Sequence, residues 1–133
     1  VELSVLTQAL DGQHLLAGLC GACTVILGQQ AVRSCSTPVK DVAGKQVLTI
    51  EGLSKNGKLH PIQDAFLKHH AFQCGYCTSG MIVNAYALLQ KTPRPTRAQI
   101  IQHMDDNFCR CGSHMRIVEA IQEAAGARQG GGR

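Results

Sequence analysis

Seven cysteines constrain this 133-residue chain more than any other feature. They form three close pairs and one single residue: Cys20 and Cys23, Cys74 and Cys77, Cys109 and Cys111, and Cys35. A disulfide framework is the usual explanation in a small secreted protein. The odd count argues against it, and so does the Cys-x-Cys pair, which can hardly bridge itself without strain. The pattern favours thiolates that bind metal.

Composition excludes several classes of function. Hydrophobic residues make up 44% of the chain, which is enough for a packed core. The formal net charge is only +4 and is spread evenly, so no binding to nucleic acid is expected. No stretch approaches the roughly 18 apolar residues of a membrane helix, and no signal peptide is recognisable. The chain begins at Val1, so we expect the natural N-terminus to lie upstream.

The first half, residues 1–56, is predicted to be a small α+β domain. Its expected elements, in order, are a helix over residues 3–10, a Gly/Cys loop over 12–23, strands over 24–27, 31–34 and 47–50, and a linker over 52–58. The first two strands are joined by Gly28-Gln29-Gln30, which is a hairpin signal.

The second half, residues 57–128, is predicted to be helical. Pro61 favours a helix start, and Thr96 and Ser113 are good N-cap residues. The expected helices begin at Pro61, span residues 78–90, run from the Thr96 cap to Met104, and follow Ser113 with Met115, Val118, Ile121 and Gln122 on one face. The Gly-rich tail, residues 129–133, is predicted to be disordered.

Four cysteines lie just before predicted helix starts: Cys74, Cys77, Cys109 and Cys111. Helix N-termini carry free N–H groups and partial positive charge, which favour thiolates. Gly75 and Gly112 allow the backbone to approach the sulfurs. Two antiparallel helices between the pairs would bring them back together at one metal site. A [2Fe–2S] cluster and a structural zinc ion both accept four thiolates, so the residues alone leave both open.

Cys20, Cys23 and Cys35 form a second group. Plant-type ferredoxins bind their cluster through Cys-x4-Cys-x2-Cys and a distant fourth cysteine. In that pattern the first ligand would fall at position 15, which is Leu15. Leucine cannot bind iron, so this group offers three ligands.

Five motifs together are similar to the small iron–sulfur subunit of the molybdenum hydroxylases, the xanthine oxidase and aldehyde oxidoreductase family. They are Cys20-Gly-Ala-Cys-Thr-Val25, Arg33-Ser-Cys-Ser-Thr-Pro38, Thr49-Ile-Glu-Gly-Leu53, Phe72-Gln-Cys-Gly-Tyr-Cys77 and Asn107-Phe-Cys-Arg-Cys111. The similarity extends to about Ala125. Gly112-Ser-His-Met-Arg116 resembles the isoquinoline oxidoreductase and aldehyde dehydrogenase branch.

The resemblance implies a plant-ferredoxin-like β-grasp domain followed by a four-helix domain, each with one [2Fe–2S] cluster. It implies a large partner subunit with molybdopterin, near which Gln73 and Cys111 lie. Electrons would pass from molybdopterin through the two clusters to FAD or haem c on another partner, a flavin subunit or a c-type cytochrome. The substrate would be an aldehyde or an N-heteroaromatic compound, with no substrate chemistry on this chain. The location would be cytoplasmic, or periplasmic and membrane-associated through partner subunits.

The sequence departs from this family in three places. The opening hairpin is absent, so the β-grasp is expected to be truncated. The loop around Leu15 and Leu16 lacks a Gly-Cys step, a Gly-Cys dipeptide that the family has at this place. We interpret this difference as missing residues. The alternative is a cluster with three ligands. Ser79 stands where the family often has proline, and serine also suits a helix start. Two other functions stay open, a stand-alone ferredoxin and a zinc-stabilised interaction module.

Overall fold

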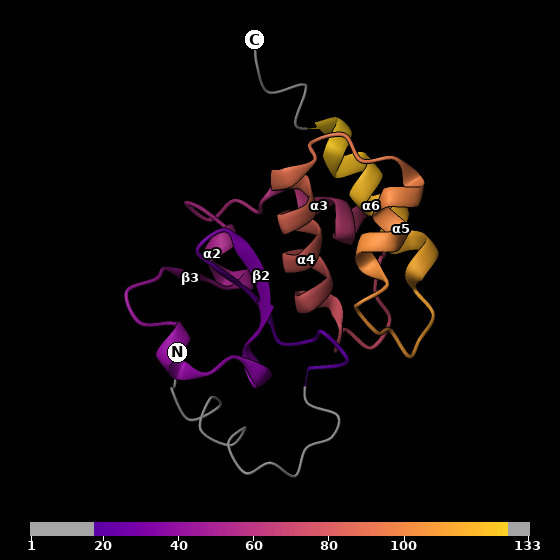
Figure 1. Cartoon of the computed structure of the whole chain (residues 1–133). Helices are drawn as coiled ribbons and strands as arrows, with labels where there is room; N and C mark the ends of the chain where they lie inside the picture. The colour runs from indigo at the N-terminus through magenta and orange to yellow at the C-terminus, as the bar shows by residue number, and fades with distance from the viewer. Residues whose placement is uncertain (1–17, 128–133) are drawn as a thin grey trace.

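The computed structural model describes residues 18–127. The predicted helix over residues 3–10, Leu15 and the tail lie outside the described residues. The elements are β1 (Thr24–Leu27), β2 (Gln30–Arg33), the 3-10 helices η2 (Ser34–Ser36) and η3 (Val39–Asp41), β3 (Val47–Leu48), α2 (Ile50–Leu53), α3 (Pro61–Lys68), α4 (Thr78–Lys91), α5 (Arg97–Met104) and α6 (His114–Ala127). Figure 1 shows α4 between the small sheet and helices α5 and α6.

The sheet has the order β2-β1-β3, and both pairings are antiparallel. The predicted hairpin is confirmed, with its second strand one residue earlier than expected, so the turn is Gly28-Gln29. Gly28 has φ +63°, a conformation that glycine adopts at little cost. The strand predicted over 47–50 is wrong at its end, because Ile50 already begins α2.

The segment predicted as a linker is partly regular structure. Helix α2 extends into it as far as Leu53. Lys55 and Lys58 then exchange two backbone hydrogen bonds of 3.0 and 2.9 Å. Between them Asn56 and Gly57 both have positive φ, which is the Asn-Gly turn typical of tight hairpins. The division into domains at residues 56 and 57 stays a prediction.

The predicted helix starts are confirmed at Pro61, Thr78 and after Thr96. At the start of α3, the Gln63 side chain accepts a hydrogen bond from the His60 backbone N–H at 2.8 Å. Its amide also donates to the Ile50 carbonyl at 3.1 Å. This buried side chain therefore caps α3 and joins it to α2.

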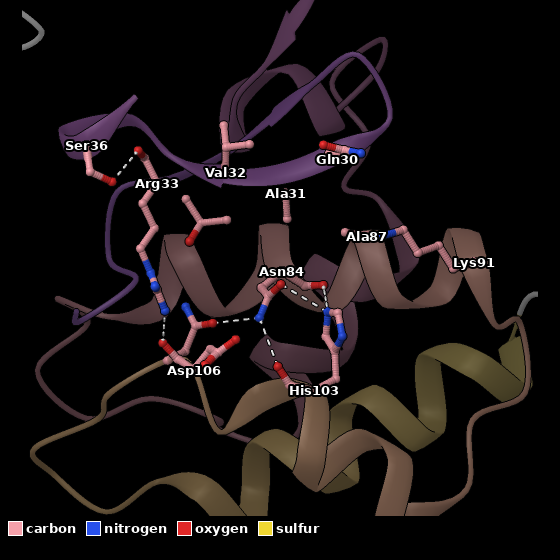
Figure 2. A pocket seen from close by; sticks show the side chains of 12 residues that line it. Gln30, Ala31, Val32, Arg33, Ser36, Asn84, Ala87, Lys91, His103 and Asp106 are labelled. Atoms are coloured by element: carbon pink, nitrogen blue, oxygen red, sulfur yellow. Dashed lines mark hydrogen bonds between the residues drawn. The ribbon is translucent and has the colours of Figure 1, made fainter. Parts of the chain in front are cut away.

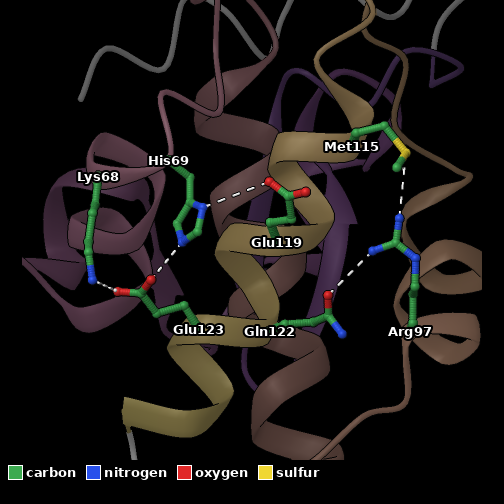
Figure 3. A network of polar contacts seen from close by, with 7 residues as sticks. All are labelled: Lys68, His69, Arg97, Met115, Glu119, Gln122 and Glu123. Carbon is green, nitrogen blue, oxygen red and sulfur yellow. Dashed lines mark hydrogen bonds and ion pairs between the residues drawn. The ribbon is translucent and has the colours of Figure 1, made fainter.

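Helix α6 begins after Ser113 as predicted, but its predicted inward face is half wrong. Val118 and Ile121 are buried, whereas Met115 is 60% exposed and Gln122 is also exposed. Figure 3 shows Arg97 of α5 beside both residues, donating to Gln122 Oε1 at 3.4 Å and to Met115 Sδ at 3.5 Å. The inward stripe is shifted to residues 117, 118, 121 and 124.

Helices α3 and α6 also meet through a polar contact at their rim. Lys68 Nζ lies 2.7 Å from Glu123 Oε1, and His69 Nε2 lies 2.6 Å from Glu123 Oε2 (Figure 3). Glu119 lies farther from the ring, 3.9 Å from His69 Nδ1. Exposed ion pairs add little stability, so the packing of these helices depends mainly on the apolar contact beneath.

A single apolar core joins the sheet to the helices. Its largest fully buried side chains are Phe66, Ile62, Met81, Leu89, Ile100, Ile117, Ile121 and Val83. Ile26 of β1 belongs to the same cluster. Burial of each such side chain contributes about 1.5–3 kcal/mol. This core fixes α4, whose N-terminus lies between the cysteine loops. Within residues 18–127, no helix is long and apolar enough to cross a membrane.

Candidate metal centre

Two loops carry the four C-terminal cysteines, and each loop ends at a helix start. Cys77 is the N-cap residue of α4, and Gly75 before it has φ +84°. The second loop reaches α6 through Gly112, with φ +76°. Tight turns therefore place both loops at helix N-termini, as the sequence predicted. Cys109 is buried and Cys77 half-buried, while the other two cysteines of this group are exposed.

The structure brings these four thiols together as two pairs. The thiols of Cys77 and Cys109 are in hydrogen-bonding contact, and so are those of Cys74 and Cys111. Each pair combines one cysteine from each loop. The inner pair is at least half-buried and the outer pair is exposed.

The backbone favours negative charge on one thiol of each pair. Burial opposes ionisation of Cys109, but N–H groups of residues 111, 112 and 113 and the Cys77 thiol outweigh it, so its pKa is lowered. The Tyr76 backbone N–H, followed by the Cys111 thiol, lowers the pKa of Cys74. Helix starts and turns thus supply the donors that thiolates require.

The other thiol of each pair is held in its neutral form. Burial, together with the contact and charge of Cys109, raises the pKa of Cys77 to about 12. A Cys74 backbone hydrogen bond favours the Cys111 thiolate, but the Cys74 thiol, burial and nearby charge outweigh it and raise the pKa. Four thiolates in this space would need bound positive charge, which is what metal ions provide.

The N-terminal group is less complete among the described residues. Cys23 and Cys35 are half-buried and in contact, and Cys20 is exposed. The Ser34 hydroxyl and backbone N–H both donate to the Cys23 carbonyl, at 3.0 and 3.3 Å. Burial raises the pKa of Cys35, and the Cys23 thiol adds to this. Leu15, which stands where the ferredoxin pattern has its first ligand and cannot bind iron, lies outside the described residues.

A two-iron cluster fits the C-terminal donor set. A [2Fe–2S] cluster takes two thiolates on each of two irons. Two thiol pairs with backbone donors match this requirement. The buried Thr78 hydroxyl next to Cys77 also has no hydrogen-bond partner, so a polar acceptor is missing there.

The two cysteine groups are joined by contacts that the sequence did not reveal. The Phe108 backbone N–H donates to the Cys20 carbonyl at 2.9 Å. The buried Asn107 amide donates to the Gly21 carbonyl at 3.1 Å. A Cβ at Gly80 would lie 2.1 Å from that same carbonyl oxygen. The first turn of α4 therefore packs directly against the N-terminal loop.

Asn84 of α4 stabilises the contact between the two cysteine loops through Asn107. Its amide nitrogen donates to Asn107 Oδ1 at 2.6 Å, and its Oδ1 lies 3.0 Å from His103 Nε2. Figure 2 shows Asn84 and His103 facing each other beneath β2. Arg33 reaches the Asp106 carbonyl in the same view. A polar residue inside an apolar helix face was the only signal for Asn84 in the sequence.

The remaining predicted site residue, Gln73, is exposed beside Cys74. Several large apolar side chains are also exposed on the molecule. Tyr76 is 80% exposed, and Leu19, Phe108 and Met115 are also exposed. Gln73 and the outer thiol pair thus lie at the surface, where a partner can reach them.

Comparison with known proteins identifies the family. The family described as [2Fe-2S] binding domain matches residues 49–122. One subunit of the nicotinate dehydrogenase of Pseudomonas putida is 46% identical over 122 residues, covering 90% of this chain and 78% of the relative. The alpha subunit of isoquinoline 1-oxidoreductase of Brevundimonas diminuta is 53% identical over 108 residues, covering 81% and 70%.

A solved structure has the same fold. The crystal structure of the aldehyde oxidoreductase from Desulfovibrio desulfuricans matches with a TM-score of 0.82 and 38% identity, over 94% of this chain and 15% of that chain. The shared fold, the level of identity and the two cysteine groups agree with one another. The chain therefore belongs to the small [2Fe–2S] iron–sulfur subunits of the molybdenum hydroxylase family.

Proposed function

We propose that this chain relays electrons from the molybdenum cofactor of a large partner subunit to an acceptor on another partner. The proposed ligands of its C-terminal [2Fe–2S] cluster are Cys74, Cys77, Cys109 and Cys111. The observation that supports this most directly is the meeting of these thiols in two pairs at two helix starts. When bound, the cluster would supply storage for one electron at a time.

The burial of the two pairs suggests the direction of transfer. The outer pair, Cys74 and Cys111, lies at the surface beside Gln73, so we place the molybdopterin of the large subunit on this side. The inner pair lies next to the contact between Phe108 and Cys20. Electrons would enter at the exposed side and leave through the interior.

A second cluster on the N-terminal loop would complete the relay. Cys20, Cys23 and Cys35 would bind it, and the fourth ligand would be the cysteine of the Gly-Cys step that the loop around Leu15 lacks. In this proposal residues 1–56 form a truncated ferredoxin-like β-grasp and residues 57–128 form the four-helix domain. The three-stranded sheet and the helices α3 to α6 support this division.

The partners and substrate follow from the family. We propose a large molybdopterin-binding subunit, with either a FAD subunit or a c-type cytochrome as the acceptor. Relatives named for nicotinate, isoquinoline and aldehyde oxidation support a substrate that is an N-heteroaromatic compound or an aldehyde. The substrate would bind to the partner, because this chain contributes only electron transfer. Its location would be the cytoplasm, or the periplasm through its partners.

Iron content and low-temperature EPR of the dithionite-reduced protein test this function. Two rhombic signals and about four irons per chain are expected for two [2Fe–2S] clusters. One signal and about two irons per chain would show that only the C-terminal site binds a cluster. Zinc without iron would support the interaction module instead. A free-standing ferredoxin would purify without a molybdenum-bearing partner, whereas a relay subunit is expected to copurify with one.

A further inference from the structure

The hydroxyl of Thr78 is a buried donor with nothing to bind. Its Oγ1 is the one buried side-chain nitrogen or oxygen atom without a hydrogen-bond partner among residues 18–127. Buried polar groups are nearly always paired, and an exception calls for an explanation such as an acceptor that binds later. Nothing in the local backbone requires this hydroxyl, because Cys77, not Thr78, is the N-cap residue of α4.

Thr78 lies on a buried face of the first turns of α4. It directly follows Cys77 and begins the helix, and residues three and four positions on share its face. These are Met81 and Ile82, which are both buried. Met81 lines a hollow together with Phe108 and Ile117, next to the loop that carries Cys109. Thr78 is thus joined directly to the inner ligand Cys77, and its hydroxyl is buried at the helix start that carries this ligand.

The inner thiol beside it is short of donors. Cys109 receives hydrogen bonds from three backbone N–H groups, and Cys74 receives two, from Tyr76 and from its own backbone. Cys77 receives a hydrogen bond only from its own backbone N–H. A sulfur with a single backbone donor and a hydroxyl that lacks an acceptor thus occupy adjacent residues.

We propose that the Thr78 hydroxyl donates a hydrogen bond to a sulfur atom of the bound cluster on the Cys77 side, and that this bond raises the cluster's reduction potential. The inference rests on the proposed function. The reduced cluster is one charge more negative than the oxidised one, so a donor to its sulfur stabilises the reduced form more. In this role Thr78 acts through the cluster, by stabilising its reduced form, and takes no part in substrate chemistry.

The test compares Thr78→Val with Thr78→Ser in the protein purified with its partner. Valine keeps the shape of threonine and removes the hydroxyl, whereas serine keeps the hydroxyl. Ser79→Ala is the matched control, because that neighbouring hydroxyl contacts the Ala22 carbonyl at 3.4 Å and points to the other loop. The potential is read by EPR during a redox titration, on the signal that disappears in Cys109→Ser.

Thr78→Val is expected to favour the oxidised cluster up to tenfold, which is a fall of up to about 59 mV for one electron. Thr78→Ser and Ser79→Ala are expected to keep the parent potential. Pulsed EPR in heavy water should also show one exchangeable proton coupling that is lost in Thr78→Val. If that variant fails to assemble the cluster, Thr78→Ala against Thr78→Ser gives the same comparison.

Equal potentials and unchanged proton couplings in parent and Thr78→Val would overturn the inference. An equal shift in Ser79→Ala would also overturn it, since the effect would then come from the helix start and not from this hydroxyl. The iron content and EPR spectrum of the parent protein test the proposed function independently of the variants. A parent without a C-terminal cluster refutes both, whereas a parent with one and an unaffected valine variant refutes only the role of Thr78.

Discussion

The backbone N–H of Phe108 donates a hydrogen bond to the carbonyl oxygen of Cys20 across 2.9 Å. Phe108 directly precedes Cys109, so one cysteine of each group is connected through a single hydrogen bond and a few covalent bonds. Beside it, Asn107 makes a second bond to the Gly21 carbonyl. These two contacts set the spacing between the cysteine groups more directly than the long chain between them does.

Replacing Asn107 by alanine should destabilise the protein. The change removes two buried hydrogen bonds, to Gly21 and to Asn84, each of which contributes about 0.5–1.5 kcal/mol. The expected loss is about 1–3 kcal/mol in the free energy of unfolding, measured by urea denaturation. Gln102→Ala, at an exposed amide of α5, is the control and should change stability by at most about 0.5 kcal/mol. Equal effects would show that Asn107 is not a structural brace.

Gly80→Ala should separate α4 from the N-terminal loop. The new Cβ would lie 2.1 Å from the Gly21 carbonyl oxygen and 2.9 Å from Ala22 Cα, both backbone atoms. Since backbone cannot move aside cheaply, we expect a loss of about 1–3 kcal/mol, measured by thermal unfolding. Gly126→Ala in α6 meets nothing within 4 Å and is expected to gain about 0.5–1 kcal/mol from helix propensity. A neutral Gly80→Ala would contradict the close approach.

Cys109→Ser should abolish electron transfer from the molybdenum partner. Serine is a poor replacement for a thiolate ligand, so the C-terminal EPR signal should disappear while the partner stays folded by circular dichroism. Cys35→Ser is the matched variant at the other group and should remove only the second signal. Normal turnover of Cys109→Ser with an artificial outer acceptor would refute the proposed route.

Stability should fall in mild acid because of His103. Burial lowers its pKa, and the nearby Lys91 charge acts in the same direction, against opposing effects of Asn84 and Asp106. The unfolded chain therefore binds a proton at higher pH than the folded one. This contribution is complete above the ordinary histidine value of about 6.5 and is lost as the pH falls below it.

The measurement is the free energy of unfolding between pH 7.5 and 5 for the parent and for His103→Gln. The glutamine variant should show a shallower decline, because its side chain does not titrate. Parallel pH profiles for the two proteins would show that His103 has no part in the effect.

Local signals in the sequence were sufficient for most helix starts. Pro61, Thr96 and Ser113 act through their own backbone or the next turn, so their effect can be read without knowing the fold. The strand prediction at Ile50 is wrong for the opposite reason. Its carbonyl is held by the Gln63 side chain, which lies 13 residues along the chain, and no local pattern shows that contact.

The same distinction applies to the metal centre. The cysteines, their glycines and their places before helices could be identified from the sequence, because close spacing and capping are local properties. The pairing of Cys77 with Cys109, the brace at Asn107 and the unpartnered hydroxyl of Thr78 were decided by tertiary structure. They depend on how α4 and α6 pack around a common core, and packing directions arise only from contacts between residues far apart in the chain.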